Sequence, residues 1–203
     1  MTTKAKKMDP EISRRKFVTA AMAGATGIGV VSFATIIGGL RPVGFITETQ
    51  KPLEVGDVLV HAEGDKKGQP VGPDDLKANG PYITVYPKGK NGVRSEGQAG
   101  SFNAVILLKY ALSEIVAPAK PEATADGIIA LSKICTHLGC SVLAKGPDGN
   151  IPCPCHGSKF DGKSGKVLAS PAPRELPQLP IKLENGQLVV AGKWLEPVYG
   201  AKV

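Results

Sequence analysis

The residues best suited to metal chemistry are concentrated in two short stretches of this 203-residue chain. All four cysteines and two of the three histidines lie in "CTHLGC", residues 135–140, and "CPCHGS", residues 153–158. Thiolates and imidazoles are the ligands that proteins use for zinc and for iron–sulfur groups. Six such ligands exceed the four that one tetrahedral ion uses. A more economical division gives four of them to a metal centre and joins two cysteines to each other.

Both stretches have the composition of loops between β-like segments. Their spacing is Cys-x-His-x-x-Cys, then twelve residues, then Cys-x-Cys-His. Gly139 and Gly157 allow a close approach of the backbone, and Pro152 and Pro154 stiffen the second loop. A structural zinc site is one interpretation, although zinc sites usually pair their ligands as Cys-x2-4-Cys. The third histidine, His61, matches neither stretch and is predicted to be an ordinary surface or loop residue.

The arrangement resembles the Rieske iron–sulfur family, and in particular the Rieske subunits of bacterial cytochrome bc-type (quinol–cytochrome c reductase) complexes. In that family two thiolates bind one iron of a 2Fe-2S cluster and two imidazoles bind the other. The resemblance implies that Cys135 and Cys153 bind the inner iron. It implies that His137 and His156 bind the outer iron, with their second nitrogens available for proton exchange.

Four further positions take their expected roles from the same resemblance. Cys140 and Cys155 are expected to form a disulfide between the loops, which requires an oxidising compartment. Ser158 holds the place of a serine that donates a hydrogen bond to a cluster sulfur and raises the potential. Phe160 stands where the quinol-oxidising members often have a tyrosine. We expect the missing hydroxyl to lower the potential, which suits menaquinol, unless Phe160 merely packs the domain.

The tip of the first loop and a later proline-rich segment also match the family. Leu138 and Gly139 are expected to form the apolar tip that docks at a quinol pocket. The segment "SPAP", residues 170–173, resembles the loop that covers the cluster, with Pro171 and Pro173 as its stiff residues. A glycine is more familiar where its serine stands, and an ordinary connecting loop is the alternative.

The function implied by the resemblance is electron transfer from quinol to a c-type cytochrome. Quinol is expected to form a hydrogen bond with an exposed ligand imidazole, His156 above all, with His137 beside it. The cluster then takes one electron and the imidazole takes one proton. The domain swings to deliver its electron to a c-type haem, while the second electron passes to cytochrome b. The expected partners are therefore quinol, a cytochrome b subunit and a c-type cytochrome, within a dimeric complex.

Other classes of protein remain open as alternatives. The first is the small Rieske electron-relay subunit of a periplasmic molybdenum oxidase such as arsenite oxidase, which needs neither a hinge nor a quinol surface. Soluble Rieske ferredoxins and ring-hydroxylating oxygenases match less well, because they normally lack the extra cysteine pair and a membrane span. A zinc-stabilised binding module is the non-redox alternative.

The elements that position the two loops are predicted to be short β-strands. Turn sequences separate the apolar runs, and "ENG" at residues 184–186 is expected to close a hairpin. Composition favours a small all-β sandwich or barrel. The resemblance implies an all-β Rieske domain, with stacked antiparallel sheets and two cluster-binding loops, plus one N-terminal transmembrane helix. The predicted strands are Val55–Val60, Tyr82–Tyr86, Ala104–Lys109, Ile128–Leu131, Ser141–Ala144, Ile181–Leu183 and Leu188–Ala191. Residues 61–101 are expected to form a long excursion between strands, and Tyr110–Val116 has weak helical character.

Charge and hydropathy divide the chain into parts. Residues 1–16 carry six Lys/Arg and two acidic residues, +4 of the total +7, which argues against a basic nucleic-acid-binding face on the folded domain. Residues 17–40 carry no charge and as a helix would extend about 36 Å, enough to span a membrane core of about 30 Å. We predict a cytoplasmic terminus (1–16), a transmembrane anchor (17–40), a hinge (41–51) and a Rieske domain (52–203), with its cluster-binding subdomain at about 132–174.

The basic terminus also predicts the side of the membrane on which the domain lies. "SRRKFV", residues 13–18, resembles a twin-arginine export signal. The alternatives are ordinary positive-inside flanking charge and a secretory signal cleaved near "AMA", residues 21–23. Export predicts a single-pass protein in contact with membrane lipid, with its domain on the outer, periplasmic face of the bacterial inner membrane.

Overall fold

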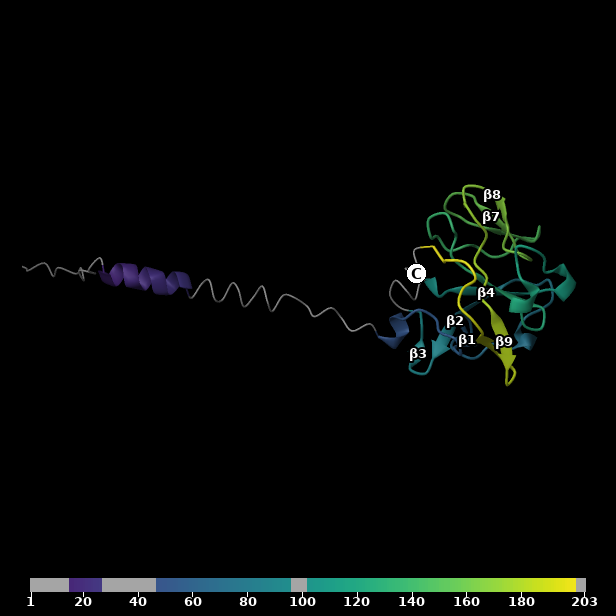
Figure 1. The fold of residues 1–203 in the computed structure, drawn as a ribbon, viewed down its shortest axis with the longest axis horizontal. Coiled ribbons are helices and arrows are strands. Elements are labelled where there is room, and N and C mark those ends of the chain that lie inside the picture. The colour runs from purple at the N-terminus through teal and green to yellow at the C-terminus, as the bar shows by residue number, and fades with distance from the viewer. Residues whose placement is uncertain (1–14, 27–46, 96–101, 200–203) are drawn as a thin grey trace, which may run out of the picture. The chain divides into compact units, whose positions relative to one another are not determined.

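The computed structural model of the chain describes residues 15–26, 47–95 and 102–199 (Figure 1). The chain separates into two compact units, Met1–Phe45 and Ile46–Val203. In the first unit residues 15–26 are helical. Within the described ranges, no helix has both the length and the apolar character needed to cross a membrane. Most of the predicted anchor, residues 27–40, lies outside the described residues.

The described part of the second unit is an all-β domain, which confirms the predicted fold class of the domain. Its strands are β1 (Val58–His61), β2 (Ile83–Gly89), β3 (Gly92–Val93), β4 (Val105–Lys109), β5 (Ile128–Ser132), β6 (Asn150–Pro152), β7 (Lys159–Asp161), β8 (Val167–Ala169), β9 (Ile181–Glu184) and β10 (Gln187–Val190). Short 3-10 helices lie in the connections: η1 (Glu48–Gln50), η2 (Pro73–Asp75), η3 (Leu112–Glu114) and η4 (Pro121–Ala123).

The strands form two antiparallel sheets. The larger has the order β5-β4-β2-β1-β10-β9, with β3 paired to β2, and the smaller has the order β6-β7-β8. The larger sheet curls on itself, because the segment that leads into β9 at one edge also runs along β5 at the other. Leu131 forms a bridge with Gln178, and the Leu179 N–H donates to the Ala130 carbonyl over 2.9 Å. In Figure 1 the smaller sheet lies at the top of the domain and β9 points toward its lower end.

Strand β4 separates two apolar cores, because successive side chains of a strand point to opposite faces. Val105 and Leu107 belong to what we call the base core, and Ile106 and Leu108 to the loop core. Strand β5 is divided in the same way. The base core also contains Leu59, Val71, Val85, Leu179, Ile181, Leu188 and Val190. The loop core also contains Cys135, Val142, Ile151, Cys153, Phe160 and Leu176. Burial on both faces explains why β4 reads as an unbroken apolar run.

The predicted hairpin at residues 184–186 is confirmed as the β9–β10 turn. Asn185 and Gly186 have φ angles of +50° and +77°. Two left-handed residues between antiparallel strands make the type I′ geometry whose twist matches that of the strands. Six of the seven predicted strands overlap observed ones.

Other predictions about the elements were wrong. Ser141–Ala144 is not a strand, since Ser141 makes only an isolated bridge with Ile134. Residues 61–101 are not simply an excursion, because β2 and β3 within them belong to the larger sheet. Strands β6, β7 and β8 have three residues each, which is too short for an alternating pattern to stand out.

The prediction for His61 was also wrong. This residue ends β1 and is buried, with only 8% of its surface exposed. Its Nε2 atom lies 3.5 Å from Oδ2 of Asp75, which also accepts the Gly72 N–H, while Oδ1 of Asp75 pairs with Lys66. Burial alone raises the pKa of Asp75, but Lys66, the Gly72 N–H and His61 together hold that pKa below its usual value. His61 is therefore part of a buried polar contact far along the chain from both ligand loops.

Candidate metal centre

The two hexapeptides fold as two copies of the same turn. In each, the N–H of the first residue donates to the carbonyl of the sixth, and the N–H of the fifth donates to the carbonyl of the first. These distances are 2.8 Å (Cys135–Cys140), 3.0 Å (Gly139–Cys135), 2.8 Å (Cys153–Ser158) and 3.2 Å (Gly157–Cys153). Gly139 and Gly157, at the fifth positions, have φ angles of +82° and +79°. Glycine adopts this left-handed conformation without steric cost, so both loops require it there.

A disulfide joins the first and second ligand loops, residues 135–140 and 153–158. Cys140 and Cys155 are bonded with an S–S distance of 2.08 Å, which confirms the predicted pairing. The bond leaves Cys135 and Cys153 as free thiols. As predicted, two cysteines are joined in a disulfide and the other two are free thiols.

The two free thiols lie below the surface, in the loop core. Cys135 is 1% exposed and Cys153 is 3% exposed. Burial raises the pKa of the Cys135 thiol, and the neighbouring Cys153 raises it further, while the His137 N–H and the Ser158 hydroxyl lower it. An apolar pocket that holds two thiols together favours a bound cation or cationic cluster, because metal coordination stabilises thiolates.

The two imidazoles lie at the surface and face each other through the same ring atom. Nδ1 of His137 is 3.2 Å from Nδ1 of His156, and the rings meet edge to face. His156 is exposed and His137 is half-buried. Nitrogens bound to one metal ion at about 2.0–2.1 Å each are expected to lie about this far apart. Because the Nδ1 atoms face each other, the Nε2 atom of each ring remains available to a second partner.

These four side chains fit the cluster that the sequence predicts. The donors come as a buried thiol pair and an exposed imidazole pair, and a 2Fe-2S cluster of the Rieske type takes one such pair at each iron. A structural zinc ion would instead need four donors around one point.

Ser158 is placed to act on the thiol pair. It is fully buried, and its Oγ accepts the Ala172 N–H over 2.9 Å. That bond leaves the hydroxyl proton free to be donated, and the hydroxyl lowers the pKa of Cys135. A donor to sulfur stabilises the more negatively charged state of such a site. The hydrogen bond from Ser158 to a cluster sulfur stays a prediction.

The proline-rich segment contacts both ligand loops. Ala172 is buried between the exposed residues Pro171 and Pro173 and binds Ser158 of the second loop, as described above. Just beyond it, the carbonyl of Arg174 accepts a hydrogen bond from Oγ1 of Thr136 in the first loop, over 2.6 Å. Ala172 and Arg174 therefore lie against the two ligand loops, and the covering role of residues 170–173 stays a prediction. The Thr136 bond was not predicted, because no local pattern relates residues 38 positions apart.

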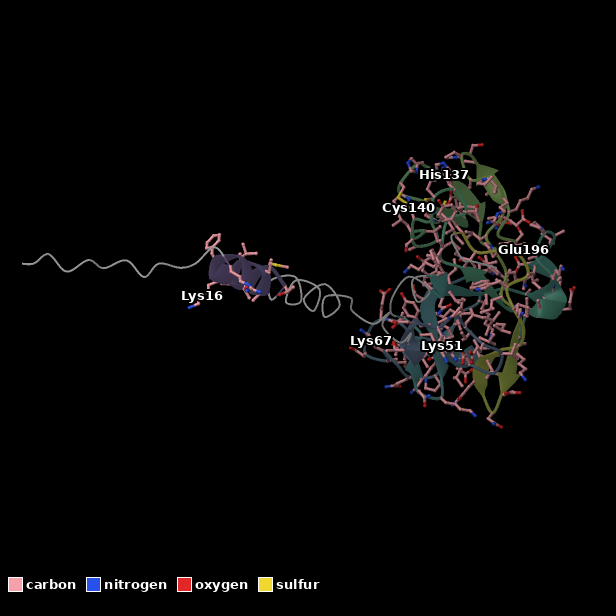
Figure 2. All side chains as sticks on the ribbon, turned by 60° about the vertical axis from the view of Figure 1, so that its left-hand side comes forward. Lys16, Lys51, Lys67, His137, Cys140 and Glu196 are labelled. Atoms are coloured by element: carbon pink, nitrogen blue, oxygen red, sulfur yellow. A yellow bond between two sulfur atoms is a disulfide. The ribbon has the colours of Figure 1, made fainter. Side chains whose placement is uncertain are left out.

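The predicted docking tip lies at the surface beside the imidazoles. Leu138 is 54% exposed, and Gly139 follows it. Figure 2 shows His137 and Cys140 at one end of the domain, with Lys51, near the start of the domain, toward the opposite end. The loops therefore present an apolar side chain and two imidazoles together, away from the start of the domain.

Phe160 is fully buried in β7 and pairs in register with Ile151 of β6. It belongs to the loop core together with Cys135 and Cys153. The packing role considered from the sequence is therefore real, and the ring also lies in the core that surrounds both thiols.

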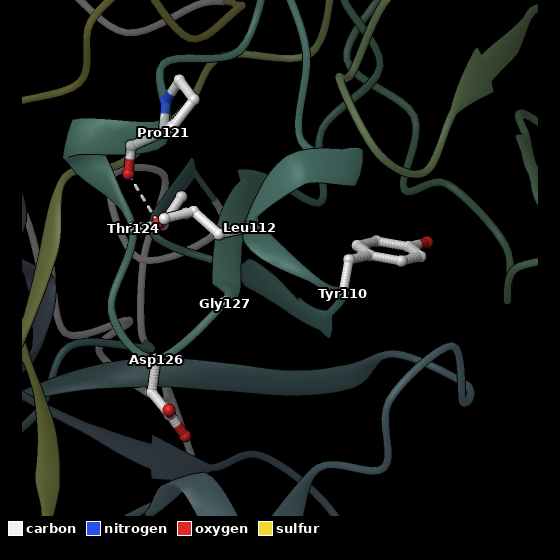
Figure 3. A pocket seen from close by; sticks show the side chains of 6 residues that line it. All are labelled: Tyr110, Leu112, Pro121, Thr124, Asp126 and Gly127. Atoms are coloured by element: carbon white, nitrogen blue, oxygen red, sulfur yellow. Dashed lines mark hydrogen bonds between the residues drawn. The ribbon is translucent and has the colours of Figure 1, made fainter.

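A hollow elsewhere on the domain does not coincide with the predicted site. It has a volume of about 460 Å³ and is open to solvent. Figure 3 shows the side chains that line it: Tyr110, Leu112, Pro121, Thr124, Asp126 and Gly127. None of these is a predicted ligand.

Comparisons with known proteins agree with this site. Residues 77–180 match the model of the Rieske [2Fe-2S] domain. A Haloferax mediterranei protein, named as the Rieske subunit of a respiratory nitrate reductase, is 31% identical over 92% of this chain and 80% of its own length. The cytochrome bc1 complex Rieske iron–sulfur subunit of Streptomyces coelicolor is 30% identical over 92% of this chain. This chain spans 53% of that subunit's length.

Solved structures include similar proteins. The plasma membrane Rieske protein of the cyanobacterium Synechocystis PCC 6803 is 26% identical, with a TM-score of 0.38. The match covers 60% of this chain and 95% of that one. The region matched by the family model makes up a little over half of the chain and contains both ligand loops. The chain belongs to the Rieske [2Fe-2S] domain family.

Proposed function

We propose that this chain is the Rieske subunit of a cytochrome bc-type complex, which takes an electron and a proton from quinol and passes the electron to a c-type cytochrome haem. The observation that carries the proposal is the pair of outward-lying imidazoles above two buried thiols, beside the exposed Leu138. The name of the Streptomyces coelicolor relative, which aligns with 92% of this chain, supports it.

The cluster would be held by four residues in two pairs. Cys135 and Cys153 would hold the inner iron, and His137 and His156 would hold the outer iron through the Nδ1 atoms that face each other. When bound, a Rieske-type cluster supplies one-electron transfer at a potential that imidazole ligation raises. Ser158, whose Oγ accepts the Ala172 N–H and keeps its own proton free, would donate a hydrogen bond to a cluster sulfur, which favours the reduced state.

The surface residues recognise the quinol. The Nε2 atom of His156, the more exposed imidazole, accepts the hydrogen bond of a quinol hydroxyl and then its proton. His137 is half-buried beside it, and Leu138 gives the tip an apolar side chain that can enter a quinol pocket. The buried environment of the thiols keeps water away from the inner end of the site.

The partners follow from this reaction. The cytochrome b subunit provides the quinol pocket and a c-type cytochrome accepts the electron, in a dimeric complex. The protein is anchored once in the bacterial inner membrane, with its domain on the outer face. The disulfide between the loops supports that location, because such bonds persist in oxidising compartments. We assign a low-potential quinol such as menaquinol as the substrate, on the basis of Phe160.

The connector between anchor and domain is proposed to be a hinge, with a fixed end at the domain. Asn103 is buried, accepts the Leu53 N–H over 3.0 Å and donates to the Lys51 carbonyl over 2.9 Å. These two bonds hold the chain from residue 51 onward. We propose residues 41–51 as the hinge, with these two bonds at its domain end.

Stiffening that segment tests the hinge. We expect two added prolines within residues 41–46 to slow quinol–cytochrome c turnover, because proline restricts backbone rotation. The cluster's spectrum should stay unchanged, because the prolines are distant in sequence from both ligand loops. Turnover measured in membranes, with the spectrum as the control, checks this. Undiminished turnover would count against a swinging domain.

A charge at the docking tip tests the proposed reaction. Leu138→Glu should abolish quinol-dependent reduction of cytochrome c, because a carboxylate resists transfer into an apolar pocket. The iron content should remain at two per chain. Leu183→Glu is the matched control, since Leu183 is a similarly exposed leucine on β9, and it should retain full activity. Equal activity in both variants would exclude docking through Leu138, and a chain without iron would exclude the cluster.

A second candidate function is that of an electron-relay subunit in another respiratory oxidoreductase. The name and the 80% coverage of the Haloferax mediterranei relative favour it. A periplasmic molybdenum oxidase such as arsenite oxidase is the enzyme class considered from the sequence. A relay needs no quinol, so a wild-type chain that accepts electrons from a non-quinol donor in membranes but not from quinol would favour this function.

A further inference from the structure

We propose that the C-terminal segment, residues 194–199, is a strap that holds the first ligand loop in position, and that Tyr199 is its positioning residue. The strap fixes the tip formed by Leu138 and Gly139. The predicted effect on quinol binding rests on the proposed function. The predicted effect on the mobility of the first ligand loop does not.

The strap is attached to the domain along its length. The Leu195 N–H donates to the carbonyl of Gln178 over 3.0 Å, and Oε2 of Glu196 accepts the Gln178 N–H over 3.2 Å. Gln178 is itself 3% exposed, and Val198 is 2% exposed. Figure 2 shows Glu196 on the side of the domain, between the end that carries His137 and the end near Lys51. The segment is therefore a fixed part of the fold.

Arg174 connects the strap to the first ligand loop. Its guanidinium donates a hydrogen bond to the carbonyl of Pro197, and its own carbonyl accepts the hydroxyl of Thr136. Thr136 is 2% exposed and stands between Cys135 and His137 in the sequence. A single residue thus bonds the strap on one side and the ligand loop on the other.

Tyr199 then contacts the loop directly, at the glycine behind its tip. A Cβ atom added to Gly139 would lie 2.7 Å from Cδ1 and 3.0 Å from Cε1 of the Tyr199 ring. A real Cβ atom essentially never lies closer than 3.0 Å to such a neighbour, so the Tyr199 ring occupies the space that a side chain at Gly139 would need. The contact is made by ring carbons, and the hydroxyl plays no part in it.

The second loop offers an internal comparison. Gly157 has the same place in its turn and nearly the same φ angle, +79° against +82°. A Cβ atom added to Gly157 would meet nothing within 4 Å. Backbone conformation therefore requires glycine at both positions, but only Gly139 is also covered by an aromatic ring. The strap acts on the loop that carries Leu138 and His137 and leaves the other loop free at this point.

The consequence is a tip whose position depends on a residue 60 positions away. The disulfide fixes one end of the first loop and the Cys135 hydrogen bond fixes the other. Tyr199 restrains the part between them, where Leu138 must meet its partner. Removing the ring should leave the ligands and the cluster in place while the tip becomes mobile. We therefore expect binding of the partner, rather than the chemistry of the cluster, to change.

Alanine substitutions in the cluster-loaded full-length chain test the strap. Tyr199→Ala should raise the hydrogen-exchange rate of the Gly139 amide by about tenfold, within the range that contacting residues contribute. Tyr199→Phe keeps the ring and should match the wild type. In membranes, Tyr199→Ala should raise the KM for quinol several-fold, with kcat, iron content and potential nearly unchanged.

A double-mutant cycle separates the contact from backbone strain. Gly157→Ala introduces only left-handed strain, whereas Gly139→Ala adds the clash with the ring, so Gly139→Ala should destabilise the chain more. In the double variant Gly139→Ala/Tyr199→Ala, the additional destabilisation caused by the clash should disappear. If Gly139→Ala and Gly157→Ala are equally costly, or if Tyr199→Ala leaves exchange at Gly139 unchanged, the strap is wrong. If exchange rises but no variant or wild-type chain oxidises quinol, the strap stands and the proposed function fails.

Discussion

At the scale of single residues, the cysteines of the site are buried and the histidines lie nearer the surface. The thiols of Cys135 and Cys153 are almost completely buried, whereas His156 is exposed and His137 half-exposed. An iron bound by these thiols would thereby be shielded from water, and the imidazole nitrogens remain accessible to a proton donor. This gradient is what coupled transfer of an electron and a proton requires, because the proton must enter and leave from the surface.

Phe160 provides a prediction at this scale. Phe160→Tyr places a hydroxyl in the core that contains both thiols, and a donor to a ligand sulfur stabilises the reduced state. We expect the midpoint potential to rise in a redox titration of the variant. Phe102→Tyr, which adds the same hydroxyl outside the loop core, is the control and should leave the potential unchanged. An unchanged potential in Phe160→Tyr would mean that the ring serves packing alone.

The two ligand loops could be recognised in the sequence because each is a local motif of six residues. The assignment of Cys135, His137, Cys153 and His156 as the metal ligands stays a prediction. The contacts of Thr136 with Arg174 and of Gly139 with Tyr199 could not be predicted in this way. They join residues far apart in the chain, and neither partner has a distinctive residue type. His61 was misjudged for the same reason, since η2 covers it from a distant segment.

At the scale of elements, β4 and β5 support the ligand loops. Their alternate side chains fill the base core on one face and the loop core on the other. The two ligand loops are therefore supported by β4 and β5, whose positions the larger sheet fixes. The sequence identified both strands because they are apolar over five residues, and it missed β6 to β8 because each has only three.

Two substitutions on β4 test whether its two faces support different cores. Leu107→Ala and Leu108→Ala remove equal side chains, both fully buried, from opposite faces. Each should lower the free energy of unfolding by about 2–5 kcal/mol in denaturant titrations. Only Leu108→Ala should also accelerate reduction of the Cys140–Cys155 disulfide by a small thiol, because only Leu108 lies in the loop core. Similar acceleration in both variants would contradict the separation of the two cores.

At the scale of the whole molecule, the ligand loops and the start of the domain lie toward opposite ends. Figure 2 shows His137 and Cys140 at one end and Lys51, whose carbonyl Asn103 binds, toward the other. Such a division is what a mobile electron carrier needs, since one end docks while the other remains tethered. The uncharged run at residues 17–40 and the basic residues before it are the sequence features that predict the tether.

The central claim is that a Rieske cluster on this chain meets quinol, and one measurement addresses it most directly. Low-temperature electron paramagnetic resonance would be recorded on reduced native membranes, with and without an inhibitor of the quinol-oxidation pocket. We predict a Rieske-type signal whose shape changes when the inhibitor is present, because the inhibitor then lies against the exposed imidazoles. A Rieske-type signal indifferent to the inhibitor would contradict the quinol site and favour a relay, and the lack of any such signal would contradict the cluster itself.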